Sequence, residues 1–425
     1  IFIMSPGFLT MFYLWTILPQ SHAIRDAGPM ERAFFTSVYR LVFFNALSTS
    51  DNYLLYRIFR TSVRILGALL VCLEIWHLVG DELRLEDIIF GANVTIIHLI
   101  SVWKITIMAS KKDVFNKLAK ALDSPNFDVS TQRRKEIVNH WAETHKKYLY
   151  VVLVIAYPTY FVWQLYPMFD EEKFNLMVDL KLPFEYDAPL RYVLTYIGVG
   201  TVFHYVSFMV MVCDVLMQAY LVPLICQFDV LADCFENIFD ECAAEFQASF
   251  PEIDTDELVN NNLFVNKYLK RLSDLVTRHQ AVLKQAVDLK GILSAPMLGQ
   301  LVCSGLIICL VGYQATATMA ANLGRFFQSL LYLSYTMFSL YLLCRWCEEI
   351  ASQSEHIGES AYFSGWESGI SQAPGVRAAI MLVIARSNTP LIFFAGGMYP
   401  LSLTTYSTLV KASYSALNLL LTTND

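Results

Sequence analysis

The sequence predicts an all-α, seven-transmembrane helical membrane protein with its N-terminus inside and cytosolic helical extensions that form an anchor bundle. Only 16% of its 425 residues are charged and 55% are hydrophobic, whereas about a quarter of the residues in a soluble domain are charged. The apolar residues gather in blocks of roughly 20, the length at which a helix crosses the hydrocarbon core of a bilayer. Helices satisfy their own backbone hydrogen bonds in lipid, and the alternating apolar pattern of a membrane β-barrel is missing from the sequence.

Seven apolar blocks define the predicted spans. In chain order, spans 1 to 7 cover residues 62–79, 88–108, 148–166, 192–226, 292–319, 326–343 and 390–421. We assign residues 62–421 to one seven-span domain and residues 30–61 to a cytosolic N-terminal segment that precedes it.

Residues 1–29 fit this plan poorly. Residues 7–18 are apolar and Ser21-His22-Ala23 loosely resembles a cleavage site, so a secretory signal peptide is one interpretation. No positive charge precedes the apolar stretch, although a signal peptide has a basic region there. We therefore expect 1–29 to be a non-native extension and Met30 to be the first native residue.

The charges of the connecting loops predict the orientation. Residues 111–147, between spans 2 and 3, hold nine basic and five acidic residues. The two loops that join spans 1 to 2 and spans 3 to 4, residues 80–87 and 167–191, contain more acidic than basic residues. Because positive loops stay in the cytosol, the N-terminus is predicted inside, and seven spans place the C-terminus outside. This orientation is inverted relative to a G-protein-coupled receptor.

Two stretches outside the spans have the pattern of amphipathic helices. In 254–289, apolar residues recur every three to four positions, which predicts a helix that runs straight into span 5. The acidic stretch 229–245 has similar spacing. We expect anchor helices at about 229–290 and 345–389. Their apolar stripes need a partner, either within the chain or in another subunit, and the spacing does not distinguish the two.

Several ionisable residues lie inside predicted spans, for example Glu74, Lys104 and Asp214. Charged groups are costly in the membrane core and pair, face the bundle interior or extend to the interface. Lys104 and Asp214 lie near the inner ends of their spans, so we expect them to pair or to extend toward water. For Glu74 and the neighbouring His77, an orientation toward the bundle interior stays open.

Motifs of catalysis are missing from the sequence. It has no glycine-rich phosphate loop and no His-Glu-x-x-His, and Gly365-Trp366-Glu367-Ser368-Gly369 places its serine one position late for a nucleophile elbow. Cys344 and Cys347 form a Cys-x-x-Cys pair without the strand–helix context of a redox site. We expect no enzyme activity, no metal site, no cofactor and no disulfide framework. The net charge of −7 argues against a nucleic-acid partner.

The C-terminal part of the chain carries a series of motifs in a fixed order. Ala361-Tyr362 is followed by Trp366, a proline junction stands at Thr389-Pro390, and the last span ends in Lys411-x-Ser-Tyr-Ser. In this order and spacing the tail resembles that of the insect odorant receptor family, and the likeness extends more diffusely over 57–421. Gustatory receptors, which are related to this family, carry Thr-Tyr with Gln-Phe five residues later. Here Thr405-Tyr406 is not followed by Gln-Phe. The chain also lacks the co-receptor's long insertion between spans 4 and 5.

This resemblance implies a ligand-tuning subunit of an odorant-gated, non-selective cation channel. In the family, four subunits surround a central pore lined by the last span, here about 390–421. Cytosolic helices hold the subunits together, and tuning subunits assemble with a shared olfactory co-receptor. The expected ligand is a small volatile odorant, and the expected location is the plasma membrane of olfactory sensory neurons.

The family's ligand pocket lies in the outer half of the membrane between spans 2, 3, 4 and 6. The matching half-spans are rich in aromatic residues, which suit small apolar ligands. The alternative is that these side chains only pack the bundle. The predicted ligand-binding residues are Phe90, Val94, Tyr157, Tyr160, Phe161, Gln164, Tyr196, Phe203, His204, Phe327, Leu331 and Tyr335.

The predicted pore face lies on the last span. Lys411, Tyr414, Asn418 and Leu421 are spaced at i, i+3, i+7 and i+10 and share one helix face. Asn418 aligns roughly with the narrow gate of the family, where a ring of polar and aliphatic side chains gates conduction. Lys411 is unusual in a cation pore and is expected to turn from the axis or to snorkel. A packed helix with a rotated pore face is the alternative.

Two rival functions fit the sequence less well. A G-protein-coupled receptor would have the opposite orientation, Asp-Arg-Tyr at the end of span 3 and Asn-Pro-x-x-Tyr in span 7, and none of these is present. A transporter would show an inverted repeat or paired broken spans, which we do not find.

The orientation makes a direct prediction. An epitope tag placed after Asp425 should bind antibody on intact cells, because an odd number of spans from an inside N-terminus leaves the C-terminus outside. Staining that requires permeabilisation, in cells whose surface delivery is shown by biotinylation, would contradict the predicted orientation or span number.

Overall fold

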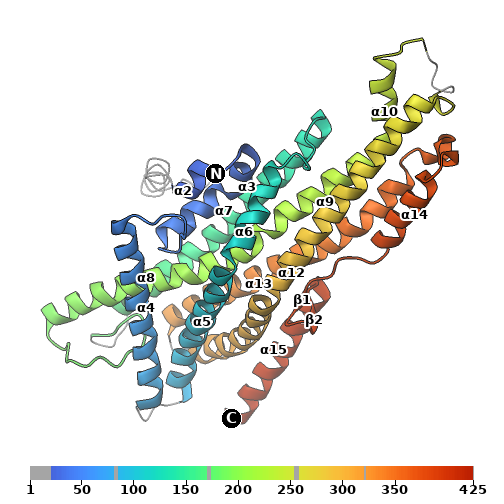
Figure 1. Cartoon of the computed structure of the whole chain (residues 1–425). Coiled ribbons are helices and arrows are strands. Elements are labelled where there is room, and N and C mark those ends of the chain that lie inside the picture. Colours follow the sequence, from blue (N-terminus) through green and yellow to red (C-terminus); the bar gives the residue numbers. More distant parts are fainter. Residues whose placement is uncertain (1–20, 81–84, 170–173, 253–257, 320–321, 425) are drawn as a thin grey trace, which may run out of the picture. The chain divides into compact units, whose positions relative to one another are not determined.

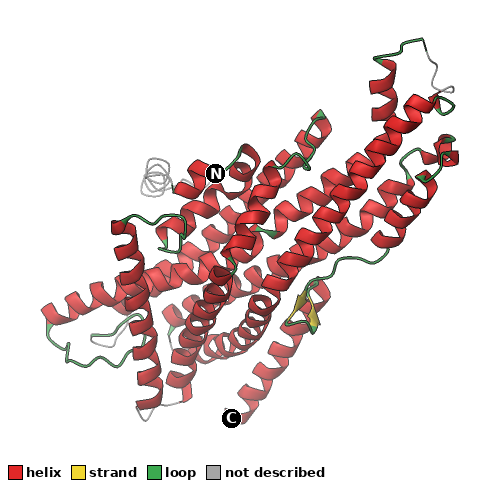
Figure 2. Cartoon of the chain, viewed as in Figure 1, coloured by secondary structure: helices red, strands yellow, loops and turns green. Residues whose placement is uncertain are grey.

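The computed structural model describes residues 21–80, 85–169, 174–252, 258–319 and 322–424. Over these residues the regular secondary structure is helical apart from one two-stranded hairpin, with loops between the helices (Figure 2), so the predicted all-α class is confirmed. It divides into two compact units. Unit 1 consists of the residues up to Val102 with Leu153–Leu216 and Leu310–Tyr332. Unit 2 consists of Trp103–Val152, Met217–Cys309 and the residues from Leu333 onward.

Long helices account for predicted spans 1 to 6 (Figure 1). Within the described residues, six helical stretches are long and apolar enough to cross a membrane. They contain α4 (Leu54–Gly80), α5 (Leu85–Ser110), α7 (Gln132–Phe169), α8 (Pro189–Ala219) with α9 (Leu221–Glu236), α12 (Asn262–Thr318) and α13 (Leu323–Tyr362). The seventh predicted span corresponds to α15 (Leu403–Asn424), whose threonine, serine, lysine and asparagine residues keep it outside that set.

The predicted span 192–226 lies within one apolar helical stretch, Pro189–Glu236, which is interrupted at a single residue. The structure divides it between α8 and α9 at Tyr220. Pro223 explains the position of this break, because proline has no N–H to donate to the carbonyl of Ala219 four residues earlier. Helix α10 (Ile238–Gln247) follows α9, so the helical spacing predicted for 229–245 is confirmed.

The predicted start of the last span at residue 390 was wrong. The segment before α15 is extended, and strands β1 (Phe394–Ala395) and β2 (Tyr399–Pro400) pair as an antiparallel hairpin. The turn uses Gly396 and Gly397 at φ of 60° and 73°, a conformation that glycine adopts without strain. A Cβ at Gly396 would lie 2.6 Å from a Leu298 methyl carbon, so no side chain fits there.

Helix α15 begins at Leu403 because its first backbone donors find acceptors there. The Leu403 amide donates to the Glu348 carboxylate at 2.9 Å, and the Thr405 amide donates to the Ser402 hydroxyl at 3.2 Å. Such acceptors satisfy the orphan N–H groups of a helix terminus, and a carboxylate also favours the positive end of the helix dipole.

The segments predicted as anchor helices are largely helical, as expected. Helix α12 runs without interruption from Asn262 into predicted span 5, while residues 254–257 lie outside the described part of the chain. The 345–389 segment holds the end of α13, two 3₁₀ turns at Trp366–Ser368 and Ile370–Gln372, and α14 (Val376–Ser387). The remaining helices are α6 (Lys112–Lys120) with the 3₁₀ turn Ala121–Asp123, and, before α4, α2 (His22–Asp26) and α3 (Pro29–Phe44).

Ser21 and His22 contact the loop before α4. Ser21 and Ser48 each donate a hydroxyl hydrogen bond of 2.6 Å to Asp51, and the His22 amide donates to the same carboxylate at 3.0 Å. Burial alone would raise the pKa of Asp51, but these donors lower it. Residues 1–20 lie outside the described residues, so the start at Met30 stays a prediction.

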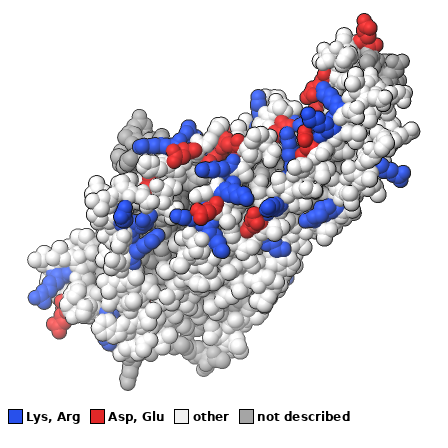
Figure 3. All heavy atoms as spheres, viewed as in Figure 1, with Lys and Arg blue, Asp and Glu red and all other residues white. Residues whose placement is uncertain are grey.

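Charged side chains of both signs interleave over the α9, α10 and α12 region of unit 2 (Figure 3). At the centre lies Arg134, whose side chain is completely buried and pairs with Asp128, Asp233 and Glu241. Arg271 also bonds Asp128, at 2.7 Å. Burial alone would raise the pKa of Asp128, but hydrogen bonds from Arg271 and Ser130 hold it well below its usual range. These ion pairs join α7, α9, α10 and α12.

Replacement of Arg134 by methionine should destabilise unit 2 by about 3–5 kcal/mol, because it leaves buried carboxylates without their partner. Arg133 is the matched control, since its side chain is 68% exposed although it also pairs with Asp233. The melting temperature of each variant is measured in detergent, with the labelling of buried cysteine thiols as the readout of unfolding. Equal melting temperatures for Arg134→Met and Arg133→Met would contradict the prediction.

Candidate functional site

Eleven of the twelve predicted ligand-binding residues lie in unit 1, and Tyr335 lies in unit 2. Helix α5 carries Phe90 and Val94, α7 carries Tyr157, Tyr160, Phe161 and Gln164, α8 carries Tyr196, Phe203 and His204, and α13 carries Phe327 and Leu331. The exposed side chains of Phe161 and Phe327 (58% and 50%) point away from the packed interior. The others contribute to contacts between these four helices or are partly buried.

A tryptophan that sequence reasoning missed lies at the centre of the first aromatic cluster. The Trp163 ring stacks on Phe90 at a centroid distance of 5.6 Å and on Phe203 at 5.8 Å, and Tyr332 meets it edge-on at 6.1 Å. These four side chains, the Trp163 cluster, come from α7, α5, α8 and α13. Trp163 lies three residues after Tyr160, so an extended helical stripe from Tyr160 would have included it.

A second aromatic cluster joins α7 to α8. The Tyr160 ring lies 4.8 Å from His204, and the Tyr157 ring lies 5.6 Å from Phe208. His204 and Phe208 are themselves 4.6 Å apart. Phe208 was not predicted, although it follows His204 by one helical turn. Aromatic pairs in such geometries stabilise helix contacts beyond their buried area.

Polar contacts fix the register of α7 against its neighbours. The Gln164 amide donates to the Gly200 carbonyl at 3.1 Å, and the Tyr196 hydroxyl donates to the Gln164 carbonyl. A Cβ at Gly200 would lie 3.1 Å from the Gln164 side-chain oxygen, so the small residue permits this approach. The Thr159 hydroxyl reaches the Leu331 carbonyl on α13 at 3.4 Å.

A cavity adjoins the Trp163 cluster through Phe90. Its lining comes from α5, the end of α12 and the start of α13, namely Ile89, Phe90, Tyr313, Gln314, Ala317, Thr318 and Arg325. The Arg325 guanidinium lies 5.8 Å from the centre of the Phe90 ring and donates to the Tyr166 hydroxyl at 2.6 Å. Asn93 donates to Gln314 at 3.4 Å. The cavity therefore has an aromatic wall and several polar groups.

Buried ionisable residues connect α4, α5 and α12. The Glu74 carboxylate lies 2.9 Å from Nδ1 of His98, and both side chains are buried. Sequence reasoning named Glu74, and only the structure identifies His98 as its partner. The His98 ring also meets Phe203 of the Trp163 cluster edge-on at 6.0 Å. In unit 2, Lys104 donates to Gln300 at 2.5 Å, which confirms pairing rather than extension into water.

The predicted pore face of α15 is exposed. Lys411, Tyr414 and Asn418 are accessible, with Tyr414 at 61%, and Leu421 is half-buried. The opposite face packs within unit 2: Tyr406 meets Tyr341 of α13, and Ser413 donates to the Gly305 carbonyl of α12 at 3.0 Å. The face with Lys411 is therefore exposed within the described part of the chain.

The family model of the 7tm odorant receptors matches residues 84–414, most of the chain. The chain belongs to the odorant receptor family. Among curated relatives, it is 24% identical to odorant receptor 13a of Drosophila melanogaster over 60% of this chain and 59% of that one. It is 26% identical to the fly's putative odorant receptor 92a, over 36% of each chain, and to its odorant receptor 67a, over 34% of this chain and 35% of that one.

A solved structure has the same fold as this receptor. The insect olfactory receptor OR5 from Machilis hrabei, in complex with eugenol, matches with a TM-score of 0.75 over 92% of this chain and 99% of that one. Sequence identity is 14%, so the match concerns the fold alone. Family membership makes the receptor a multi-span membrane protein and not an enzyme, as predicted.

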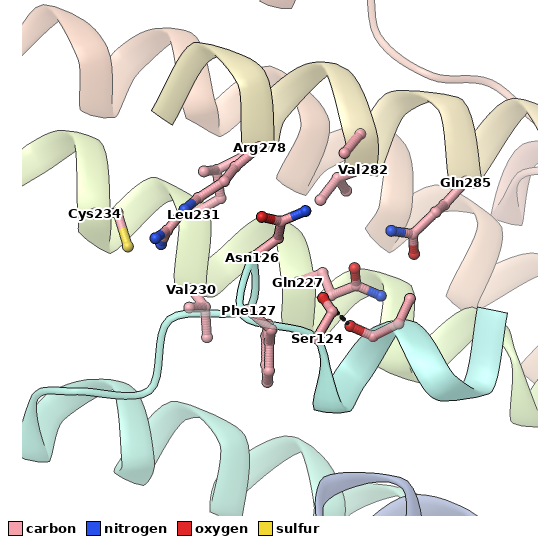
Figure 4. A pocket seen from close by; sticks show the side chains of 12 residues that line it. Ser124, Asn126, Phe127, Gln227, Val230, Leu231, Cys234, Arg278, Val282 and Gln285 are labelled. Atoms are coloured by element: carbon pink, nitrogen blue, oxygen red, sulfur yellow. Dashed lines mark hydrogen bonds between the residues drawn. The ribbon is translucent and has the colours of Figure 1, made fainter. Parts of the chain in front are cut away.

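Unit 2 of the receptor contains a second cavity, which none of the predicted ligand residues lines. Figure 4 shows it between the 121–127 segment, α9 and α12, with Ser124, Asn126, Gln227, Arg278 and Gln285 among its lining residues. Arg278 also bonds Asp128 at 3.1 Å. The cavity thus borders the ion pairs of Arg134, and we assign it no ligand.

The buried pair of Glu74 and His98 can be tested by a double-mutant cycle. Glu74→Leu alone should lower the stability of the receptor by about 3–5 kcal/mol, because it leaves His98 buried without its partner. The double replacement Glu74→Leu/His98→Leu should recover most of that loss, since two apolar side chains need no partner. Thermal unfolding in detergent reports both values. Additive losses would show that the two side chains are not coupled.

Proposed function

We propose that this receptor is a ligand-tuning subunit of an odorant-gated, non-selective cation channel, assembled with the olfactory co-receptor in the plasma membrane of olfactory sensory neurons. The observation that carries the proposal is the match of the odorant receptor family model over residues 84–414. Two structural features agree with it: the aromatic Trp163 cluster and the exposed face of α15.

The ligand of this proposal is a small volatile odorant bound beside the Trp163 cluster. Aromatic walls with few polar groups suit such ligands, because dispersion and apolar burial provide the affinity. The cavity that Phe90 shares with Arg325 lies beside this cluster. The receptor of Machilis hrabei with the same fold is described in complex with eugenol, a volatile aromatic molecule, which supports a ligand of that size.

The pore of this proposal is lined by α15 from several subunits. Among the described residues, the side chains of Lys411, Tyr414 and Asn418 form an exposed face of α15. A ring of such faces around an axis would enclose a polar path with an aliphatic constriction near Leu421. An inside N-terminus, as the loop charges predict, places that constriction toward the outer surface.

Helix α13 offers a route from ligand to pore. Tyr332 belongs to the Trp163 cluster, and Tyr341 on the same helix contacts Tyr406 of α15. A ligand that binds one orientation of α13 more tightly would shift the population of channels toward that state. Opening would then admit sodium and calcium and depolarise the neuron.

The close approach of α12 to α15 provides the test. When the receptor is expressed with the co-receptor, a panel of volatiles should evoke cation currents. Gly305→Val should reduce those currents by roughly 5–150-fold, because its side chain would meet Leu409, which lies 3.2 Å from the position of a Cβ at Gly305, and overpacking costs about 1–3 kcal/mol.

Gly291→Val is the matched control, since it lies on the same helix with open space around its Cβ position. Its currents should stay near those of the unmodified receptor at equal surface delivery. Equal currents for the two variants would refute the role of the α12–α15 contact. Complete lack of current for every volatile tested, with both subunits at the surface, would refute the channel proposal itself.

A further inference from the structure

Gln328 is a buried amide without a hydrogen-bond partner. Its side chain is 1% exposed, and neither its nitrogen nor its oxygen has a partner within the described part of the chain. A buried amide without partners is costly, and native structures contain few of them. The same cost applies inside a membrane helix bundle, because bulk water does not reach its interior to replace the missing hydrogen bonds. The amide therefore needs an explanation.

The position of Gln328 on α13 places it beside the Trp163 cluster. It follows Arg325 by three residues and precedes Tyr332 by four, so the three side chains share one helix face. Arg325 lies over the Phe90 ring and Tyr332 meets the Trp163 ring. Phe90 and Trp163 stack on each other, so Gln328 lies on the helix face whose neighbouring residues, Arg325 and Tyr332, contact this aromatic pair.

Two other buried polar groups of unit 1, on Asn93 and Ser329, also lack a hydrogen-bond partner among the described residues. Asn93 on α5 uses its nitrogen toward Gln314, and its buried oxygen has no partner among the described residues. The neighbouring Ser329 hydroxyl is likewise buried and unsatisfied in that part of the chain. Leucine or methionine at 328 would fill similar space without the penalty of a buried amide.

We propose that the Gln328 amide hydrogen-bonds the oxygen atom of a volatile ligand that lies against Phe90 and Trp163. The inference rests on the proposed function, in which this cluster binds an odorant. An amide has two donors and one acceptor group, so it serves a carbonyl oxygen through its nitrogen and a hydroxyl group through its oxygen. The proposed ligands are therefore small aldehydes, ketones and alcohols, which should bind with higher affinity than the matching hydrocarbons.

A buried water molecule would satisfy the amide as well, and the two explanations differ in what an apolar replacement does. If a bound water is the hydrogen-bond partner of Gln328, replacing Gln328 by an apolar residue should affect the binding of every ligand alike. If the ligand is the partner, the replacement should affect only the oxygen-bearing ligands. A neutral hydrogen bond lost in this way corresponds to roughly a threefold to tenfold change in affinity.

The experiment compares matched ligands on the receptor expressed with its co-receptor. Two series are applied, heptane with heptanal and heptanol, and toluene with benzaldehyde and benzyl alcohol. In the unmodified receptor the oxygen-bearing member of a series should act at lower concentration than the hydrocarbon. Gln328→Met should remove this difference by raising the concentration for half-maximal current of the oxygen-bearing members roughly threefold to tenfold, with the hydrocarbons unchanged.

Ser329→Ala is the matched control, because it removes the adjacent buried and unsatisfied polar group. It should leave the ligand ratios unchanged. Ratios that persist in Gln328→Met, or an equal loss for all members together with a lower melting temperature, would overturn the inference in favour of a packing or water-binding role.

A binding readout separates this inference from the channel proposal. Ligand-induced thermal shifts of the purified full-length receptor need no conduction, so they decide the inference even if no current is recorded. A larger shift with the oxygen-bearing member, lost in Gln328→Met, supports it. No difference between hydrocarbon and oxygen-bearing ligands in the unmodified receptor overturns it.

Discussion

The absence of water from the hydrocarbon core of a bilayer is the constraint on which the rest of this structure depends. It requires each backbone group to be satisfied within its own helix, which accounts for the long uninterrupted α12 and α13. It also requires buried polar side chains to find partners across helices. Lys104 with Gln300 and Glu74 with His98 meet that requirement. Gln328 does not meet it within the described residues, which is why a ligand is the partner that we propose for it.

The same constraint explains where the ion pairs lie. Several charges of both signs surround the buried Arg134 in the part of unit 2 that contains α9 and α10. A guanidinium group can satisfy several carboxylates at once because its donors form a fixed planar fork. This network adds polar contacts between helices that also bury many apolar side chains, among them Phe228 and Phe235 of α9, Phe246 of α10 and Phe264 of α12.

The segment before α15 shows how a helix of moderate hydropathy acquires its position. The hairpin fits only because Gly396 leaves room for Leu298, and the start of α15 depends on the Glu348 carboxylate. One face of α15 then packs through Tyr406 and Ser413. The other face carries Lys411, Tyr414 and Asn418 outward, which suits a helix that we propose to line a pore between subunits.

The sequence by itself determined the all-α class, spans 1 to 6, the helical course of α12 and the family, because blocks of apolar residues and ordered tail motifs are local properties of the chain. It also located the aromatic half-spans on α5, α7, α8 and α13. Only the tertiary structure decided that Trp163 rather than Phe161 lies at their centre, that His98 meets Glu74, and that Gln328 is buried without a partner. The break at Tyr220 and the late start of α15 were decided at the same level. The physical reason is that a helical stripe covers several neighbouring positions, and only the packing of other helices selects which of them face inward.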